Sequence, residues 1–287
     1  MRWLAAAVVW LSVAGCAASA REPAVAPREY LNVPYVVNGH ERQVLDLFLP
    51  GGTKPAPLVI WVHGGGWNAG DKSNNPARRL VERGYAVAGI NYRYSRHAIF
   101  PAQMEDVQSA VRFLRAHAAK YHLDPNRFAA WGASAGGHLV ALLGTAGDAP
   151  EFDGEQGSPP DTSARVQAVI DWFGASEMRK PDELPLNNNR INLLGGKSQE
   201  KPDLAALASP LAFVSPDDPP FLIMHGDADK TVDIEHSRRL EQALRDAGVA
   251  VTLIVLPGAG HGGDRFYEPE QIEAVNRFLD STLGHDR

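Results

Sequence analysis

The run Gly132-Ala133-Ser134-Ala135-Gly136 is the feature that most constrains what this chain can fold into. It lies between an apolar segment, residues 127–131, and a segment from Gly137 onward that is typical of a helix. A serine in a sharp turn from strand to helix needs small residues on both sides, and such a turn presents the hydroxyl above the sheet. Gly132 and Gly136 meet that need. The sequence therefore predicts that Ser134 is exposed at the carboxyl end of a strand.

A second glycine-rich motif, His63-Gly64-Gly65-Gly66-Trp67, directly follows the apolar run Leu58 to Val62. Backbone N–H groups in a loop of this kind can bind an oxygen that becomes negatively charged during a reaction. Either motif alone is a weak signal, because small residues also cluster by chance. The two motifs in this order, each after an apolar strand, favour an enzyme that forms a covalent acyl intermediate on a serine.

Strands and helices alternate along most of the chain. Strand-like runs are expected at residues 31–37, 43–48, 58–62, 86–92, 127–131, 166–173, 221–225 and 249–256. Helical periodicity is found at residues 103–117, 234–247 and 271–283. Hairpins followed by repeated strand-helix units predict an α/β fold with a mostly parallel, eight-stranded sheet and helices on both faces. Residues 147–220 depart from this rhythm, and we expect loops and short helices there, over the rim of the site.

Composition narrows the class of protein further. The chain has 287 residues, of which 44% are hydrophobic, and this length suits one large α/β domain from residue 30 to residue 287. With a formal net charge of -6, it has no electrostatic footprint for nucleic acid. No apolar stretch reaches the roughly 18 to 20 residues of a transmembrane helix.

The N-terminus has the pattern of a secretory leader, with Arg2 followed by the apolar run Trp3 to Val13. Residues 13–16, Val-Ala-Gly-Cys, resemble a bacterial lipobox, which implies a signal peptide over residues 1–15 and acylation of Cys16. An ordinary secretory leader cut after Ala20 is the alternative. Cys16 is the only cysteine, so no intramolecular disulfide can form. Residues 16–29 are expected to be a flexible tether, and Ala17 resembles the residue found in lipoproteins forwarded to an outer membrane.

A serine hydroxyl is a weak nucleophile unless an imidazole removes its proton and a carboxylate orients the imidazole. Two loops downstream of Ser134 carry these groups. One follows residues 221–225 and contains Asp227 and Asp229, and the other follows residues 249–256 and contains His261. Both loops are expected at the carboxyl ends of strands, where ligands bind in open α/β sheets.

These motifs together resemble those of the α/β-hydrolase carboxylesterases, close to the acetyl- and feruloyl-esterase-like group. The resemblance covers about residues 30 to 285. It implies an α/β-hydrolase fold with Ser134 as nucleophile, His261 as general base and then acid, and Asp229 as the orienting carboxylate. By the same resemblance, the oxyanion hole consists of the N–H groups of Gly65, Gly66 and Ala135.

Other residues compete for some of these roles. Asp227 is an alternative to Asp229, although its simpler role is to stabilise a turn. His138 lies one helical turn after Ser134, where a side chain usually points into packing. His63 is interpreted as a hydrogen-bonding brace for the oxyanion loop, and His285 as part of a polar tail.

Three aromatic residues follow strand ends near the expected site and are candidates for lining a substrate pocket. They are Trp67, Trp172 and Phe173. Aromatic side chains at such positions belong to the core equally often.

No cofactor is implied. The run Gly65 to Ser73 fails as a phosphate-binding loop because Asp71 stands where a lysine is needed, and the chain has neither an HExxH motif nor a cysteine pair for metal. The resulting hypothesis is a lipid-anchored serine esterase of the bacterial envelope that acts on short-chain, acetyl or feruloyl esters of small molecules or polysaccharides. An amidase or peptidase on the same fold is one alternative. A binding protein that keeps the fold without catalysis is another.

Overall fold

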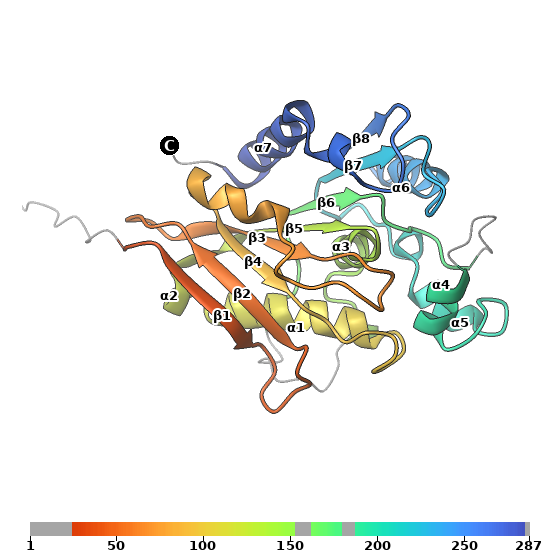
Figure 1. The fold of residues 1–287 in the computed structure, drawn as a ribbon, viewed down its shortest axis with the longest axis horizontal. Coiled ribbons are helices and arrows are strands. Elements are labelled where there is room, and N and C mark those ends of the chain that lie inside the picture. Colours follow the sequence, from red (N-terminus) through yellow and green to blue (C-terminus); the bar gives the residue numbers. More distant parts are fainter. Residues whose placement is uncertain (1–24, 153–161, 180–186, 285–287) are drawn as a thin grey trace, which may run out of the picture.

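The computed structural model describes residues 25–152, 162–179 and 187–284. Its strands form one sheet in the order β1-β2-β4-β3-β5-β6-β7-β8 (Figure 1). Their bounds are β1 (Arg28–Pro34), β2 (Val44–Leu49), β3 (Ala56–Val62), β4 (Ala86–Ile90), β5 (Leu123–Ala133), β6 (Ala168–Trp172), β7 (Phe221–Gly226) and β8 (Val251–Leu256). Only the β1–β2 and β2–β4 pairs are antiparallel. The prediction of a mostly parallel, eight-stranded sheet is confirmed.

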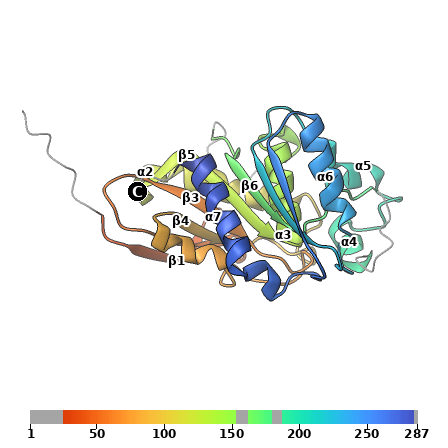
Figure 2. The same cartoon turned by 90° about the horizontal axis from the view of Figure 1, so that it is seen from above.

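The helices cover both faces of this sheet. Their bounds are α1 (Ala102–Ala116), α2 (Ala118–Tyr121), α3 (Ala135–Ala146), α4 (Asn187–Leu194), α5 (Pro202–Leu207), α6 (Glu235–Asp246) and α7 (Pro269–Leu283). Short 3-10 helices are η1 (Pro76–Arg83), η2 (Pro150–Phe152), η3 (Pro210–Ala212) and η4 (Asp264–Tyr267). One hydrophobic cluster joins α1, α3 and α6 to one face, and another joins η1 and α7 to the other. Figure 2 shows α7 lying across the sheet.

The central strands are apolar along their whole length because both faces are covered. In β3, all seven residues are buried. Leu58, Ile60 and Val62 point into the cluster with α1 and α3, whereas Val59 and Trp61 point into the cluster with α7. Because β3, β5, β6, β7 and β8 pair in parallel, their carboxyl ends lie at one edge of the sheet, where the loops that follow them meet.

The described part of residues 147–220 contains β6 and the short helices η2, α4, α5 and η3, in agreement with the predicted mixture. In Figure 1, α4 and α5 lie beyond the end of the sheet toward which the β6 and β7 arrows point. This region therefore sits beside the loops that carry the candidate site.

The described chain begins at the edge of the sheet opposite the carboxyl ends of the parallel strands. Val25 exchanges backbone hydrogen bonds with Gly52, with N–O distances of 2.6 and 2.8 Å, and Gly52 shortly precedes the amino end of β3. The expected leader, Cys16 and most of the tether lie outside the described residues. Among the helices of the described ranges, none has the length and apolarity needed to cross a bilayer.

Candidate active site

Ser134 occupies a strained turn between β5 and α3. Its φ of 56° and ψ of -117° place it in a region that non-glycine residues rarely adopt. The flanking glycines are required by close contact: a Cβ on Gly132 would lie 2.3 Å from the Gly136 carbonyl oxygen, and one on Gly136 would lie 2.0 Å from the Val62 carbonyl oxygen. The glycines therefore allow β5, the turn and β3 to approach closely enough to present the serine hydroxyl.

Three side chains from separate loops form one hydrogen-bonded chain. His261 Nε2 lies 2.8 Å from Ser134 Oγ, and His261 Nδ1 lies 2.7 Å from Asp229 Oδ2. Because an ionised carboxylate only accepts hydrogen bonds, Nδ1 carries the proton and Nε2 accepts from the serine hydroxyl. The imidazole is thus in the tautomer that can remove the proton from Ser134.

The carboxylate of Asp229 is held firmly in this arrangement. Its side chain is fully buried, and Oδ1 accepts hydrogen bonds from the backbone N–H groups of Thr231 and Val232, at 2.7 and 3.0 Å. Burial alone would raise the pKa of Asp229, but hydrogen bonds from His225, His261 and Thr231 hold that pKa well below its usual range. The carboxylate therefore stays ionised beside the imidazole.

Asp227 has a different place from Asp229, although the two are close in sequence. Its exposed side chain accepts a hydrogen bond from the Gly258 N–H at 2.6 Å. This contact ties the loop after β7 to the loop after β8, which is the turn-stabilising role considered from the sequence. It is Asp229 that the structure brings to His261.

The loop after β3 leaves backbone donors facing the same region. Gly65 and Gly66 have φ values of 110° and 57°, which favour glycine. The Gly65 carbonyl accepts from the N–H groups of Asn68 and Ala69, which closes the turn. The N–H groups of Gly65 and Gly66 donate no hydrogen bond to any acceptor among the described residues. The N–H of Ala135 lies in the first turn of α3, where helical N–H groups have no intrahelical partner.

His63 supports this loop from beneath. It is buried, its Nδ1 donates to the Gly64 carbonyl at 2.7 Å, and its Nε2 accepts from Arg42 Nη2 at 3.2 Å. Burial, with the nearby Arg42 guanidinium, lowers the pKa of His63 to about 4. A neutral ring that is bonded on both nitrogens braces the loop, as the sequence suggested, and does not exchange protons at neutral pH.

His138 is likewise fixed in the interior. Its Nδ1 accepts from the indole N–H of Trp67 at 3.1 Å, and its Nε2 donates to the Ala208 carbonyl at 2.8 Å. Burial lowers the pKa of His138 to about 4. Both ring nitrogens are therefore occupied, and His138 is not placed to act on Ser134.

A cavity of about 470 Å³ opens above Ser134. Its lining combines the glycine loop and the triad side chains with polar and aromatic residues: Trp61, His63, Gly64, Gly65, Gly66, Gly70, Asp71, Asn74, Ala133, Ser134, Phe173, Asn189, Thr231, His261 and Tyr267. Of the three aromatic candidates, Phe173 lines this cavity and packs edge-on against His261, with ring centroids 4.8 Å apart.

Two of the aromatic candidates lie elsewhere. Trp67 is 2% exposed and donates to His138, and Trp172 is 0% exposed and packs against Trp131 and Phe266. Neither lines the cavity above Ser134. The interpretation of Trp67 and Trp172 as pocket residues is therefore corrected to a core role, because neighbouring aromatic rings and His138 take up their surfaces.

Sequence reasoning did not single out Asn189 or Asp71 for this cavity. Asn189 comes from α4, and a Cβ on Gly66 would lie 2.3 Å from its Nδ2. Asp71 is held by the Ser73 N–H and by Asn91, and these hydrogen bonds outweigh burial and lower its pKa to about 2. Asp71 follows Gly70, a few residues after the glycine-rich motif, and this position could have marked it. No periodic signal marks Asn189.

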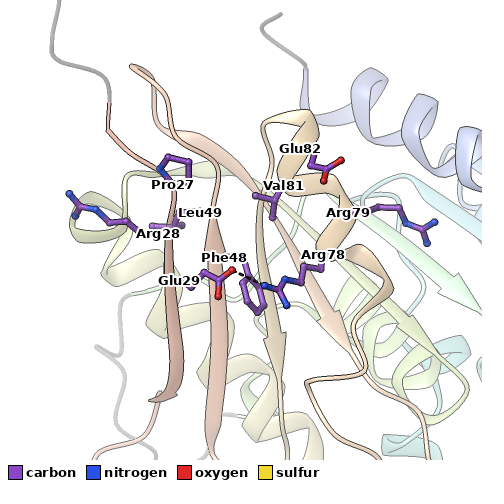
Figure 3. Close-up of a pocket in the computed structure, with 9 residues that line it drawn as sticks. All are labelled: Pro27, Arg28, Glu29, Phe48, Leu49, Arg78, Arg79, Val81 and Glu82. Atoms are coloured by element: carbon purple, nitrogen blue, oxygen red, sulfur yellow. Dashed lines mark hydrogen bonds and ion pairs between the residues drawn. The ribbon is translucent and has the colours of Figure 1, made fainter.

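A larger cavity of about 570 Å³ lies away from Ser134, between β1, β2 and η1 (Figure 3). Figure 3 shows Arg78 reaching toward Glu29, and these side chains form an ion pair at 2.7 Å. The residues that line this larger cavity include no serine, cysteine or histidine. In the part of the chain that the structure describes, no group of three or more His, Cys, Asp or Glu residues is arranged to hold a metal ion.

Two curated esterases have sequences similar to that of this chain. Esterase LipC of Mycobacterium tuberculosis is 32% identical over 250 residues, which covers 83% of this chain and 61% of LipC. Esterase LipQ of the same organism is 31% identical over 266 residues, covering 88% of this chain and 62% of LipQ. The chain thus spans about three fifths of the length of these curated relatives.

Solved structures share the fold. A truncated carbohydrate esterase from gut microbiota superposes with a TM-score of 0.80 at 33% identity, covering 89% of this chain and 96% of that one. A thermophilic esterase from Thermogutta terrifontis has a TM-score of 0.72 at 25% identity, covering 90% and 93%. Residues 45–244 match the BD-FAE family. The chain therefore belongs to the BD-FAE family, within the α/β-hydrolase carboxylesterases.

Proposed function

We propose that this protein is a carboxylic ester hydrolase that works through an acyl-enzyme on Ser134. The observation that carries the proposal is the hydrogen-bonded chain Ser134–His261–Asp229, with contacts of 2.8 and 2.7 Å. In the proposed reaction, His261 removes the hydroxyl proton as Ser134 attacks the ester carbonyl. Asp229 fixes the imidazole and stabilises the imidazolium that forms.

The oxyanion of the tetrahedral intermediate is assigned to the N–H groups of Gly65, Gly66 and Ala135. Support comes from the loop geometry, which leaves these donors unused by the described chain. His261 then protonates the departing alcohol, and a water activated by the same imidazole releases the acid. Loss of one oxyanion donor typically costs roughly 3 to 4 kcal/mol of transition-state stabilisation.

The proposed substrates carry short acyl groups, or acetyl or feruloyl groups on a small molecule or a polysaccharide. The cavity carries polar side chains beside its aromatic ones, and Asp71, Asn74 and Asn189 support an alcohol portion with hydroxyl groups rather than a long lipid chain. Among similar structures, one is named a carbohydrate esterase and another an acetyl ester-xyloside bifunctional hydrolase. These names support the same substrate class here.

A screen of nitrophenyl esters of increasing acyl length, with acetylated xylan, methyl ferulate and a nitroanilide, tests this function. Turnover is expected to be highest with short or aromatic acyl esters and to vanish in Ser134→Ala, which should keep the native melting temperature. A preference for the anilide would indicate an amidase. No turnover of any ester by the folded protein would indicate a binding role and refute the proposal.

We also propose that the mature protein is anchored in the bacterial envelope, and in the outer membrane in particular, through acylation of Cys16 after removal of residues 1–15. The lipobox-like run before Cys16 supports this, and more than one acyl chain would anchor it firmly. Mass spectrometry of the mature N-terminus tests the proposal, together with fractionation of Cys16→Ser, which is expected to leave the membrane fraction. An unmodified N-terminus at or beyond Arg21 would refute it.

A further inference from the structure

A second histidine contacts the carboxylate of Asp229. His225, the penultimate residue of β7, is fully buried, and its Nε2 lies 3.2 Å from Asp229 Oδ2. This is the same oxygen that accepts from His261 Nδ1 at 2.7 Å. The carboxylate is therefore held between two imidazoles, one facing Ser134 and one facing the interior.

The partners of His225 determine where its proton lies. Nε2 faces Asp229 Oδ2 and the Val232 carbonyl, at 3.0 Å, and both are acceptors. Nε2 must therefore carry hydrogen, which it shares between them. Nδ1 lies 2.7 Å from Ser237 Oγ, in α6, so that it accepts from the buried hydroxyl. The ring is thus fixed from both ends, and its donor is aimed at the carboxylate.

We infer that His225 is a positioning residue for ester hydrolysis, acting through Asp229 in an extended chain that runs from Ser134 through His261 and Asp229 to His225 and Ser237. This inference rests on the proposed function. His225 and His261 hold Oδ2, while the backbone N–H groups after Asp229 hold Oδ1. With both oxygens bound, the carboxylate cannot rotate away from His261. The cavity above Ser134 does not include His225 among its lining residues, so His225 does not meet the substrate.

The contact also affects the charge of the site. A hydrogen bond donated to a buried carboxylate stabilises its ionised form. Without this donor, the Asp229 carboxylate would be a stronger base and would hold the proton that it shares with the imidazole more tightly. The acidic limb of the pH–activity profile, which belongs to the hydrogen-bonded pair rather than to one residue, would move to higher pH. Apart from Asp229 and His261, two further ionisable groups lie near His225: Asp171 on β6 and His236 on α6. Asp171 interacts electrostatically with both His225 and His236.

Two amide substitutions separate the contact with Asp229 from the contact with Ser237. A glutamine amide nitrogen reaches about as far as histidine Nε2, whereas an asparagine amide reaches only as far as Nδ1. His225→Gln therefore keeps a donor for Asp229, while His225→Asn keeps a group near Ser237 and withdraws the donor. Neither amide titrates, so a change in the pH profile does not come from residue 225 itself.

The test measures kcat, KM and the pH profile with a soluble nitrophenyl ester, beside melting temperature. We expect His225→Asn to lower kcat by about 10- to 100-fold with KM unchanged. Its acidic limb should move up by about one pH unit, as the loss of one charge-assisted hydrogen bond implies. His225→Gln should stay within about fivefold of the native kcat with its limb in place, because the amide replaces a single hydrogen bond. Asp227→Asn is the matched control in the same loop, and its limb should not move.

Equal losses in both His225 variants, with the acidic limb unmoved, would show that His225 only stabilises the fold and would overturn the inference. Full activity in His225→Asn would overturn it as well. If that variant does not fold, Ser237→Ala provides the second test, because it frees the far end of the ring and should move the limb in the same direction by a smaller amount. An unmoved limb in Ser237→Ala would then count against the inference. An inactive native protein would instead refute the esterase function itself.

Discussion

Asp171 is a buried carboxyl group whose replacement by asparagine is expected to stabilise the protein at neutral pH. It lies in β6 and is 0% exposed. Its Oδ1 accepts from the Gly174 N–H at 2.9 Å, whereas Oδ2 has no hydrogen-bond partner in the described ranges. Burial raises the pKa of Asp171 from 3.8 to about 6. The charged form is therefore disfavoured in the folded state.

The sign of the effect follows from comparing the two states. Since the folded protein holds this proton more tightly than the unfolded chain, its stability is highest below the unfolded pKa and falls as pH rises toward 6. A pKa difference of roughly two corresponds to at most about 3 kcal/mol once both states are ionised. Asp171→Asn keeps the acceptor for Gly174 and removes the charge. It should raise the free energy of unfolding by about 1 to 3 kcal/mol at pH 8 and by only about 0.5 kcal/mol at pH 4.

Urea denaturation at pH 4, 6 and 8, followed by circular dichroism and checked for reversibility, measures this difference. Asp217→Asn, at an exposed position, is the control for removing a carboxylate and should show no comparable pH dependence. A variant that is less stable than the native protein at pH 8 would contradict the reasoning. That result would mean that the ionised carboxylate makes a favourable interaction beyond the Gly174 N–H.

Two further predictions concern the site. Asp229→Asn should lower turnover on the order of ten-thousand-fold, because it alters the imidazole tautomer. Asp227→Asn should lower mainly the melting temperature. If kinetics and thermal melts instead show the larger loss of turnover in Asp227→Asn, the orienting carboxylate is Asp227. Gly66→Ala should lower kcat about 100-fold or more, because its φ is 57° and the new Cβ would lie 2.3 Å from Asn189 Nδ2. If that contact contributes, adding Asn189→Ala should recover part of the loss in a double-mutant cycle, and no recovery would assign the whole loss to the backbone.

The bounds of the buried strands were predicted better than those of the edge strand β1. Residues 58–62 and 221–225 are continuous apolar runs because both faces of the sheet are covered, and they match β3 and β7 closely. In contrast, β1 runs over Arg28–Pro34 rather than residues 31–37. Most of its side chains are exposed, so burial imposes little hydrophobic pattern from which its bounds could be read.

The part of the candidate site that could be predicted from the residues is the part where the backbone conformation requires particular residue types. Gly132 and Gly136 are needed for the turn at Ser134, and this need is visible in the sequence. The difference between Asp227 and Asp229 depends on how the chain turns after β7, where the Asp229 N–H bonds to the Gly226 carbonyl at 3.3 Å. Composition does not encode that turn, and the resemblance to a family pattern supplied the choice. The catalytic roles themselves stay predictions until activity is measured.

The burial of Trp67 and Trp172 could not be read from the chain, because it depends on distant partners. Trp67 meets His138, and Trp172 meets Trp131 and Phe266. An aromatic residue after a strand can face a cavity or another aromatic ring with the same local sequence. The tertiary contacts decide between the two.

The pairing of Val25 with Gly52 determines how the molecule can be attached to a surface. Gly284, just after α7, also lies at this edge, since Arg127 reaches both its carbonyl and that of Pro55, at 3.4 and 3.2 Å. In Figure 1, the carboxyl end of α7 lies on the side away from α4 and α5. The seven residues of β3 separate this edge from the mouth above Ser134 by about 23 Å. A linker joined at Val25 or at Gly284 therefore starts from the edge of the sheet opposite the mouth above Ser134.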